Sequence, residues 1–69
     1  MSINPTIYAR FKDELSSRGW EKHTAACVEH VKARSDDPDR ALWSIVMDLR
    51  AGFILTEEDL IEHAEGMDY

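Results

Sequence analysis

Two histidines and the single cysteine recur at helical spacing and could in principle bind a metal ion. His23, Cys27 and His30 stand at positions i, i+4 and i+7, so one helix would present them on one face. Zinc requires a fourth ligand, and structural sites usually take ligand pairs from separate elements. Only His63 and scattered acids remain to complete such a site. Because free cysteines are commonly buried, we interpret Cys27 as a core residue flanked by two histidines, and expect no metal.

The patterns that would support catalysis are missing. The sequence has no glycine-rich phosphate-binding loop, and no serine or cysteine has a histidine at the spacing of a known catalytic family. A chain of 69 residues is also too short to enclose the usual substrate pocket, which measures roughly 300–1,000 Å³. We therefore expect no enzyme, no catalytic residues and no cofactor.

Helix-start and helix-stop signals divide the chain into four segments. The start signals are N-cap side chains, two of them followed by proline: Asn4-Pro5, Asp37-Pro38, and Thr56 with Asp59 three residues later. The glycines suited to a helix C-terminus are Gly19 and Gly52. Together these signals predict helices from residue 5 to near Gly19, over about 20–34, over about 38–51, and from 56 onward.

Apolar residues at helical spacing predict the core. The expected core positions are Ile7, Tyr8, Phe11, Leu15, Trp20, Thr24, Ala25, Cys27, Val28, Val31, Leu42, Ile45, Val46, Leu49, Leu60, Ile61 and Ala64. The stripes of the first two segments would lie on nearly opposite faces of a continuous helix, which favours a break near Arg18-Gly19. One long helix in an intertwined dimer is the alternative.

Two loop residues and one charged pair are also assigned from local patterns. Phe53 is placed to fold back onto the last turn of the third helix. Leu55 and Leu60 stand at the two positions of a hydrophobic staple. Arg10 and Glu14 are four residues apart on the side opposite the first stripe, in the less favourable order for an ion pair.

Length and cysteine content limit how this core is stabilised. A chain of this size buries only about 60% of its unfolded surface, and one cysteine cannot form a disulfide within the chain. We expect a single all-α domain over residues 1–69, a small bundle of three to four helices completed by homodimerisation. The lone thiol, the absence of a signal peptide and the absence of a long apolar run predict a cytoplasmic protein.

A second stripe on the third helix is a candidate binding site. Trp43, Met47 and Arg50 recur at i, i+4 and i+7, displaced by about 100° from the stripe that begins at Leu42. Tryptophan and arginine dominate binding hot spots, and methionine is enriched at interfaces. We interpret the three residues as partner-binding. The alternative is that Trp43 covers the core or forms a dimer seam.

Negative charge is concentrated in the second half of the chain. Residues 35–69 hold ten acids against two arginines, whereas residues 1–34 hold six bases against four acids. Such a surface repels nucleic acid and anionic membrane and attracts basic protein surfaces. We assign partner binding to the acidic cluster, defined as Glu57, Glu58, Asp59, Glu62 and Glu65. The alternative is a solvated face whose first acids stabilise the helix dipole.

In length, charge and helical plan the whole chain resembles a family of small phage proteins. These are the quorum-sensing anti-activators of transposable Pseudomonas phages, which are related to inhibitors of type IV pilus assembly. The resemblance implies a homodimer in the host cytoplasm. It also implies binding to the DNA-binding domain of a LuxR-type activator and to a pilus-assembly ATPase. No functional residue is carried over from the family, because no motif aligns.

The resulting hypothesis is a homodimer that binds and inhibits a host protein, without direct contact to nucleic acid or membrane. An anti-CRISPR or other DNA-mimic inhibitor would use the same acids on a different target. A small transcriptional regulator is a further alternative, although its recognition helix would carry TEEDLIEHAEG where DNA demands Lys, Arg, Asn or Gln. A structural module that only dimerises is the last alternative.

Overall fold

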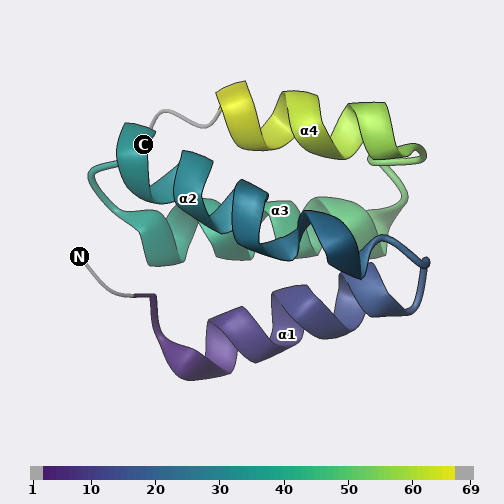
Figure 1. Ribbon diagram of the computed structural model, residues 1–69, viewed down its shortest axis with the longest axis horizontal. Coiled ribbons are helices and arrows are strands. Elements are labelled where there is room, and N and C mark those ends of the chain that lie inside the picture. The colour runs from purple at the N-terminus through teal and green to yellow at the C-terminus, as the bar shows by residue number, and fades with distance from the viewer. Residues whose placement is uncertain (1–2, 67–69) are drawn as a thin grey trace.

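Residues 3–66 are described by a computed structural model, which folds them into four α-helices and one short 3-10 helix (Figure 1). The elements are α1 (Pro5–Ser16), η1 (Glu21–His23), α2 (Thr24–Arg34), α3 (Pro38–Ala51) and α4 (Glu57–Gly66). Residues 3–66 contain no strand, so the expected all-α fold is confirmed. The bounds expected for the third helix are those observed for α3.

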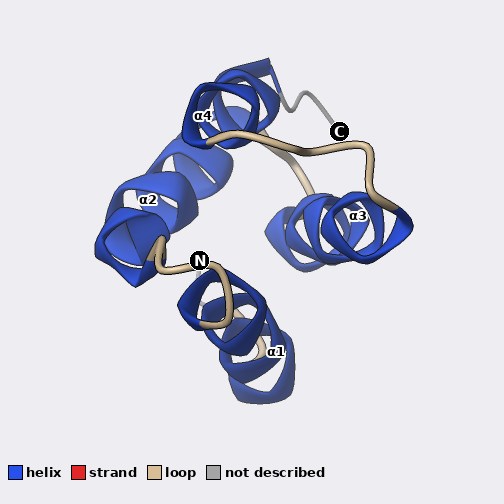
Figure 2. Ribbon diagram, turned by 90° about the vertical axis from the view of Figure 1, so that its right-hand side faces the viewer, coloured by secondary structure: helices blue, strands red, loops and turns tan. Residues whose placement is uncertain are grey.

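The helices surround one core as two pairs (Figure 2). The main partner of α1 is α3, and the main partner of α4 is α2, so neither pair is formed by neighbours in the sequence. The backbone N–H of Asn4 donates to Asp39 Oδ1 over 2.7 Å, and the Arg18 guanidinium reaches the carbonyl oxygen of Leu49 over 2.9 Å. These two contacts show that α1 and α3 run in the same direction.

Three side chains cap helix N-termini as the sequence predicts. Asn4 Oδ1 accepts from the backbone N–H of Thr6 over 2.9 Å, and Asp37 Oδ1 accepts from that of Arg40 over 3.2 Å. At α4, Thr56 Oγ1 accepts from the backbone N–H of Asp59 over 3.1 Å. Each bond satisfies an amide that has no partner within its own helix.

Two glycines end α1 and α3 with the same hydrogen-bond pattern. Gly19 and Gly52 have φ angles of 77° and 84°, where a side chain would be strained. In each case the following residue donates its backbone N–H five positions back. Trp20 N bonds to Leu15 O over 2.8 Å, and Phe53 N bonds to Asp48 O over 2.9 Å. This is the Schellman pattern, and it satisfies carbonyl groups that helix ends leave open.

The break expected between the first two helices is confirmed, but α2 begins later than predicted. Trp20 takes part in the cap of α1 and has non-helical angles, so it cannot start the next helix. The chain instead makes the 3-10 turn η1, and Thr24 Oγ1 donates to the carbonyl oxygen of Glu21 over 2.7 Å. The segment expected over 20–34 is therefore helical as α2 only from Thr24.

The core draws on all four α-helices and on the loop before α4. Its buried apolar members are Phe11, Leu15, Cys27, Val28, Val31, Ala41, Leu42, Ile45, Val46, Leu49, Ile54, Leu60 and Ala64. Ile7 and Trp20 pack against this core and are only partly buried, and Ile61 is half-buried. Tyr8 and Ala25, both expected in the core, are exposed because they lie at the edges of their stripes. No helix within residues 3–66 is long and apolar enough to cross a membrane.

Candidate protein-binding surface

The partner-binding stripe expected on the third helix lies on the outer face of α3. Trp43 is 38% exposed and Met47 is 48% exposed, while the Arg50 side chain is 56% exposed. The residue before each of them is buried, namely Leu42, Val46 and Leu49. We call Trp43, Met47 and Arg50 the α3 stripe. Its two apolar side chains, Trp43 and Met47, are exposed to solvent, although α3 also has a complete core face.

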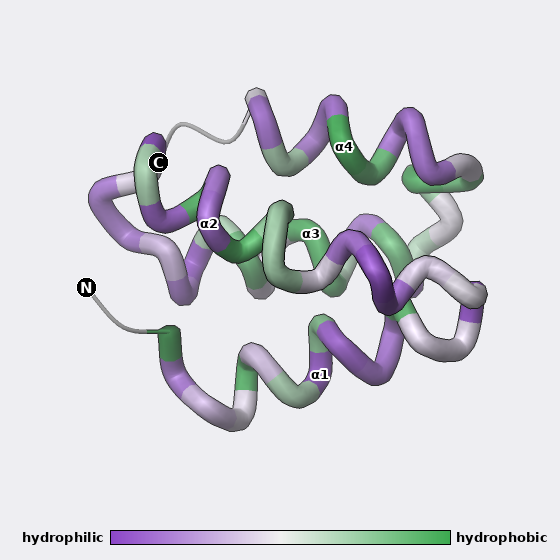
Figure 3. The backbone as a smooth tube through the Cα atoms, in the orientation of Figure 1, coloured by the Kyte–Doolittle hydropathy of each residue, from purple (hydrophilic) through white to green (hydrophobic). Residues whose placement is uncertain are grey.

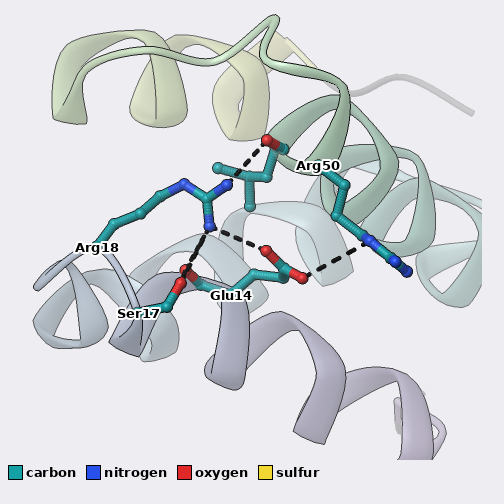
Figure 4. A network of polar contacts seen from close by, with 5 residues as sticks. Glu14, Ser17, Arg18 and Arg50 are labelled. Atoms are coloured by element: carbon teal, nitrogen blue, oxygen red, sulfur yellow. Dashed lines mark hydrogen bonds and ion pairs between the residues drawn. The ribbon is translucent and has the colours of Figure 1, made fainter.

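Arg50 is held by an ion-pair network that joins the ends of α1 and α3 (Figure 4). Glu14 lies between two arginines: its Oε2 is 2.9 Å from Arg18 Nη1, and its Oε1 is 3.9 Å from Arg50 Nε. The sequence pattern had set Arg10 four residues before Glu14. The carboxylate instead pairs with Arg18, four residues after it, in the order that helix geometry favours.

Arg18 also bonds to the backbone of both helices. Its Nη1 donates to the carbonyl oxygen of Glu14 over 2.8 Å, and its Nη2 donates to that of Leu49 over 2.9 Å. Both carbonyls lie near helix C-termini, where the helix dipole is negative. The guanidinium thus provides hydrogen bonds and positive charge to two helix ends. This arrangement fixes the position of the α3 C-terminus, from which Arg50 projects.

The acidic cluster is divided by the fold. Glu58, Glu62 and Glu65 are exposed on α4. Glu57 Oε2 instead accepts a hydrogen bond from His23 Nε2 over 2.9 Å, and Lys22 Nζ is 3.9 Å away. The hydrogen bond from His23 is the main cause that lowers the pKa of the Glu57 carboxyl, with a smaller contribution from the charge of Lys22. Glu57 therefore links α4 to η1.

Asp59 also has a partner within the chain. Its Oδ2 accepts from the backbone N–H of Leu55 over 3.4 Å, one residue earlier than a standard capping box would place the bond. The Asp59 carbonyl oxygen accepts from His63 Nδ1 over 2.8 Å. Of the five acids, Glu58, Glu62 and Glu65 therefore remain on the surface of α4. Glu57 and Asp59 instead make contacts within the chain that stabilise the start of α4.

The metal-ligand pattern of His23, Cys27 and His30 does not come together. His23 contacts Glu57, His30 is exposed, and Cys27 is buried. Burial, with a further contribution from the charge of Glu65, raises the pKa of the Cys27 thiol to about 11. Such a thiol stays protonated at neutral pH, whereas metals bind the thiolate. Residues 3–66 contain no group of three or more His, Cys, Asp and Glu placed to hold a metal ion.

Two exposed apolar side chains were not expected from the sequence. Phe53 is 71% exposed and Leu55 is 73% exposed, so the expected packing of Phe53 on α3 and the expected staple of Leu55 on Leu60 are both wrong. Ile54, between them, is 2% exposed and enters the core. Of the three consecutive apolar residues in this loop, the core therefore takes only the middle one, and both neighbours face solvent. Because all three residues are apolar, the sequence does not show which of them enters the core.

Comparison with known proteins gives no relative. No protein-family model, no curated protein and no solved structure matches the chain closely enough to assign it to a family.

Proposed function

We propose that this chain is a protein-binding module that inhibits a host protein, with the α3 stripe as one of its contact surfaces. The observation that carries the proposal is the exposure of Trp43 and Met47 on the outer face of a helix whose opposite face is fully buried. A solvent-exposed helix position does not require tryptophan or methionine, because a polar residue would serve there. Aromatic and methionine side chains are enriched where surfaces become interfaces, and tryptophan is prominent among hot spots.

The size of the chain is compatible with such an interface. A standard protein–protein contact covers about 800 Å² on each partner. The accessible surface of this structure is 4308 Å², so one partner of ordinary size would cover roughly a fifth of it. The exposed face of α3 would supply the central part of that area. Arg50 Nε is paired with Glu14 Oε1 at 3.9 Å, which reduces the entropy lost when a partner orders the arginine.

The charge of the second half supports a basic partner. Residues 35–69 hold ten acids and two arginines, and Glu58 and Glu62 face solvent. Such a field accelerates encounter with a positively charged protein, and the gain decreases as salt is added. The DNA-binding domain of a LuxR-type activator and a pilus-assembly ATPase, suggested by the resemblance, are our candidate targets. A homodimer in the host cytoplasm is part of the same proposal.

The experiment is an affinity pull-down of the tagged chain from bacterial lysate, with retained proteins identified by mass spectrometry. We expect one dominant partner that is lost in Trp43→Ser/Met47→Ser and kept in the control Tyr8→Ser, which removes an exposed aromatic group from α1. If the partner binds DNA, adding the chain should release the DNA in a gel shift. A chain that shifts DNA by itself would overturn the proposal, as would a partner-free homodimer, which would indicate a structural module.

The same assay separates the two inhibitor hypotheses. If the dominant partner is a nuclease of a CRISPR system, the DNA-mimic alternative is correct. Sedimentation of the purified chain then gives the oligomeric state. A dimer that persists in Trp43→Ser/Met47→Ser would leave the α3 stripe available to a partner, whereas dissociation of the dimer by that variant would assign the stripe to self-association.

A further inference from the structure

The loop between α3 and α4 presents the two most exposed large apolar side chains described above, Phe53 and Leu55. We propose that this pair anchors a basic amphipathic protein surface, packing against an apolar strip bordered by Lys or Arg. The inference rests on the proposed function and specifies the chemistry of the partner. It assigns binding to residues outside the α3 stripe, so the two surfaces can be tested separately.

The loop is held in place on both sides of Ile54. The backbone N–H of Phe53 is bonded to Asp48 O over 2.9 Å, and that of Leu55 to Asp59 Oδ2 over 3.4 Å. Gly52 adopts the left-handed conformation that the first of these bonds requires. Ile54 is anchored in the core. Because the backbone is already ordered, a partner that binds the two side chains pays little additional loop entropy.

The burial of Ile54 does not by itself explain why exposed phenylalanine and leucine side chains stand on either side of it. Ile54 alone of residues 53–55 enters the core, and its burial does not require its neighbours to be phenylalanine and leucine. Polar residues would serve at 71% and 73% exposure without the aggregation risk that exposed apolar patches carry. An apolar pair held rigidly in water, at the tip of a loop, has the character of a binding anchor.

The exposed acids on the α4 side of the loop favour a basic partner. The loop leads directly into the acidic first turn of α4, a change from hydrophobic to hydrophilic that Figure 3 displays along the backbone. Glu58 and Glu62 are both exposed and stand four residues apart, on one face of α4. Residues 51–66 contain no Lys or Arg. Arg50, two residues before Gly52, and Lys22, 3.9 Å from Glu57, offset part of this negative charge. The exposed carboxylates of Glu58 and Glu62 would still attract a cationic protein surface at the side of the loop that leads into α4.

The test uses two 14-residue helical peptides in NMR titrations of the full chain. One peptide has a leucine face and a lysine face, and its twin carries glutamate for every lysine. We expect the lysine peptide to shift the amide signals of residues 53–62 with saturation, and the glutamate twin to leave them unchanged. Phe53→Ser/Leu55→Ser should weaken the binding of the lysine peptide about tenfold, the effect of losing roughly 1.4 kcal/mol. Glu58→Lys/Glu62→Lys should weaken it as well, and added salt should reproduce part of the loss.

The controls keep the two proposals distinguishable. Tyr8→Ser removes exposed aromatic surface elsewhere and should leave the peptide affinity within twofold. Binding that Phe53→Ser/Leu55→Ser leaves within twofold would overturn the inference, and so would shifts confined to α3 or no binding at all. The peptide titration needs no host target. The peptide can therefore fail to bind while the pull-down still gives a partner that depends on Trp43, which would refute only the loop site. If the peptide binds and the pull-down gives no partner, only the inhibitor function is refuted.

Discussion

Replacing Arg18 with alanine tests the network that joins α1 to α3. The guanidinium donates to the Glu14 carboxylate and to the carbonyl oxygens of Glu14 and Leu49, all within 2.9 Å. Net contributions to stability are about 1.5–3 kcal/mol for a hydrogen bond that involves a charged group, but only about 0–1 kcal/mol for an exposed ion pair. With a side chain only 28% exposed, Arg18 is closer to the first case. We expect Arg18→Ala to lower the free energy of unfolding by about 2 kcal/mol.

Thermal and urea unfolding followed by circular dichroism would measure this loss. For a domain of this size, a loss of about 2 kcal/mol corresponds to a fall in Tm of roughly 8–16 °C. Arg10→Ala is the matched control, because it removes an exposed arginine from α1, the helix that Arg18 follows. Arg18→Lys keeps the charge but cannot bridge two carbonyls, so it should fall between the wild type and alanine. If Arg18→Ala costs no more than Arg10→Ala, the guanidinium does not stabilise the two helix ends and the reasoning is refuted.

Three further predictions concern other parts of the fold. Gly52→Ala should lower the stability by about 1–2 kcal/mol in urea unfolding, because its φ of 84° strains any side chain although the space around it is open; no change would contradict the strain argument. The pKa of Glu57 is lowered in the fold from its ordinary value of 4.5, so its contribution is present above that pH and lost as the pH falls through the folded pKa; Glu57→Gln should flatten this part of the stability–pH curve, unlike Glu58→Gln. Cys27 should react with a thiol reagent at pH 8 only after unfolding, since its pKa is about 11 and it is buried; rapid labelling of the native chain would exclude this placement.

Local sequence signals predicted the helix ends that depend only on residues within one turn. Asp37-Pro38 and Gly52 predicted the bounds of α3, because a cap side chain and a left-handed glycine act within one turn. The opposed stripes predicted the break after α1 for a similar reason. The start of α2 was missed because Trp20 serves the preceding cap, a role that apolar spacing does not reveal.

Contacts between distant residues could not be predicted in this way. The His23–Glu57 contact spans 34 positions, and Arg18 reaches Leu49 across 31. The sequence therefore indicated a uniform acidic cluster, whereas the fold uses Glu57 internally and leaves Glu58 exposed. The orientation of residues 53–55 was missed for the same reason, because only the assembled core determines which of three apolar side chains it accepts.

The pairing of α1 with α3 has a consequence for how the chain folds. Asn4 and Asp39 are in contact across 35 positions, and all of α2 lies between them in the sequence. Closing such a loop costs conformational entropy before the contact between the two helices stabilises the chain. Because α4 packs mainly on α2, its docking also bypasses its neighbour in sequence. Because the larger interfaces join helices that are not neighbours in the sequence, we expect the four helices to form together in one cooperative step, more slowly than in a bundle built from sequential hairpins.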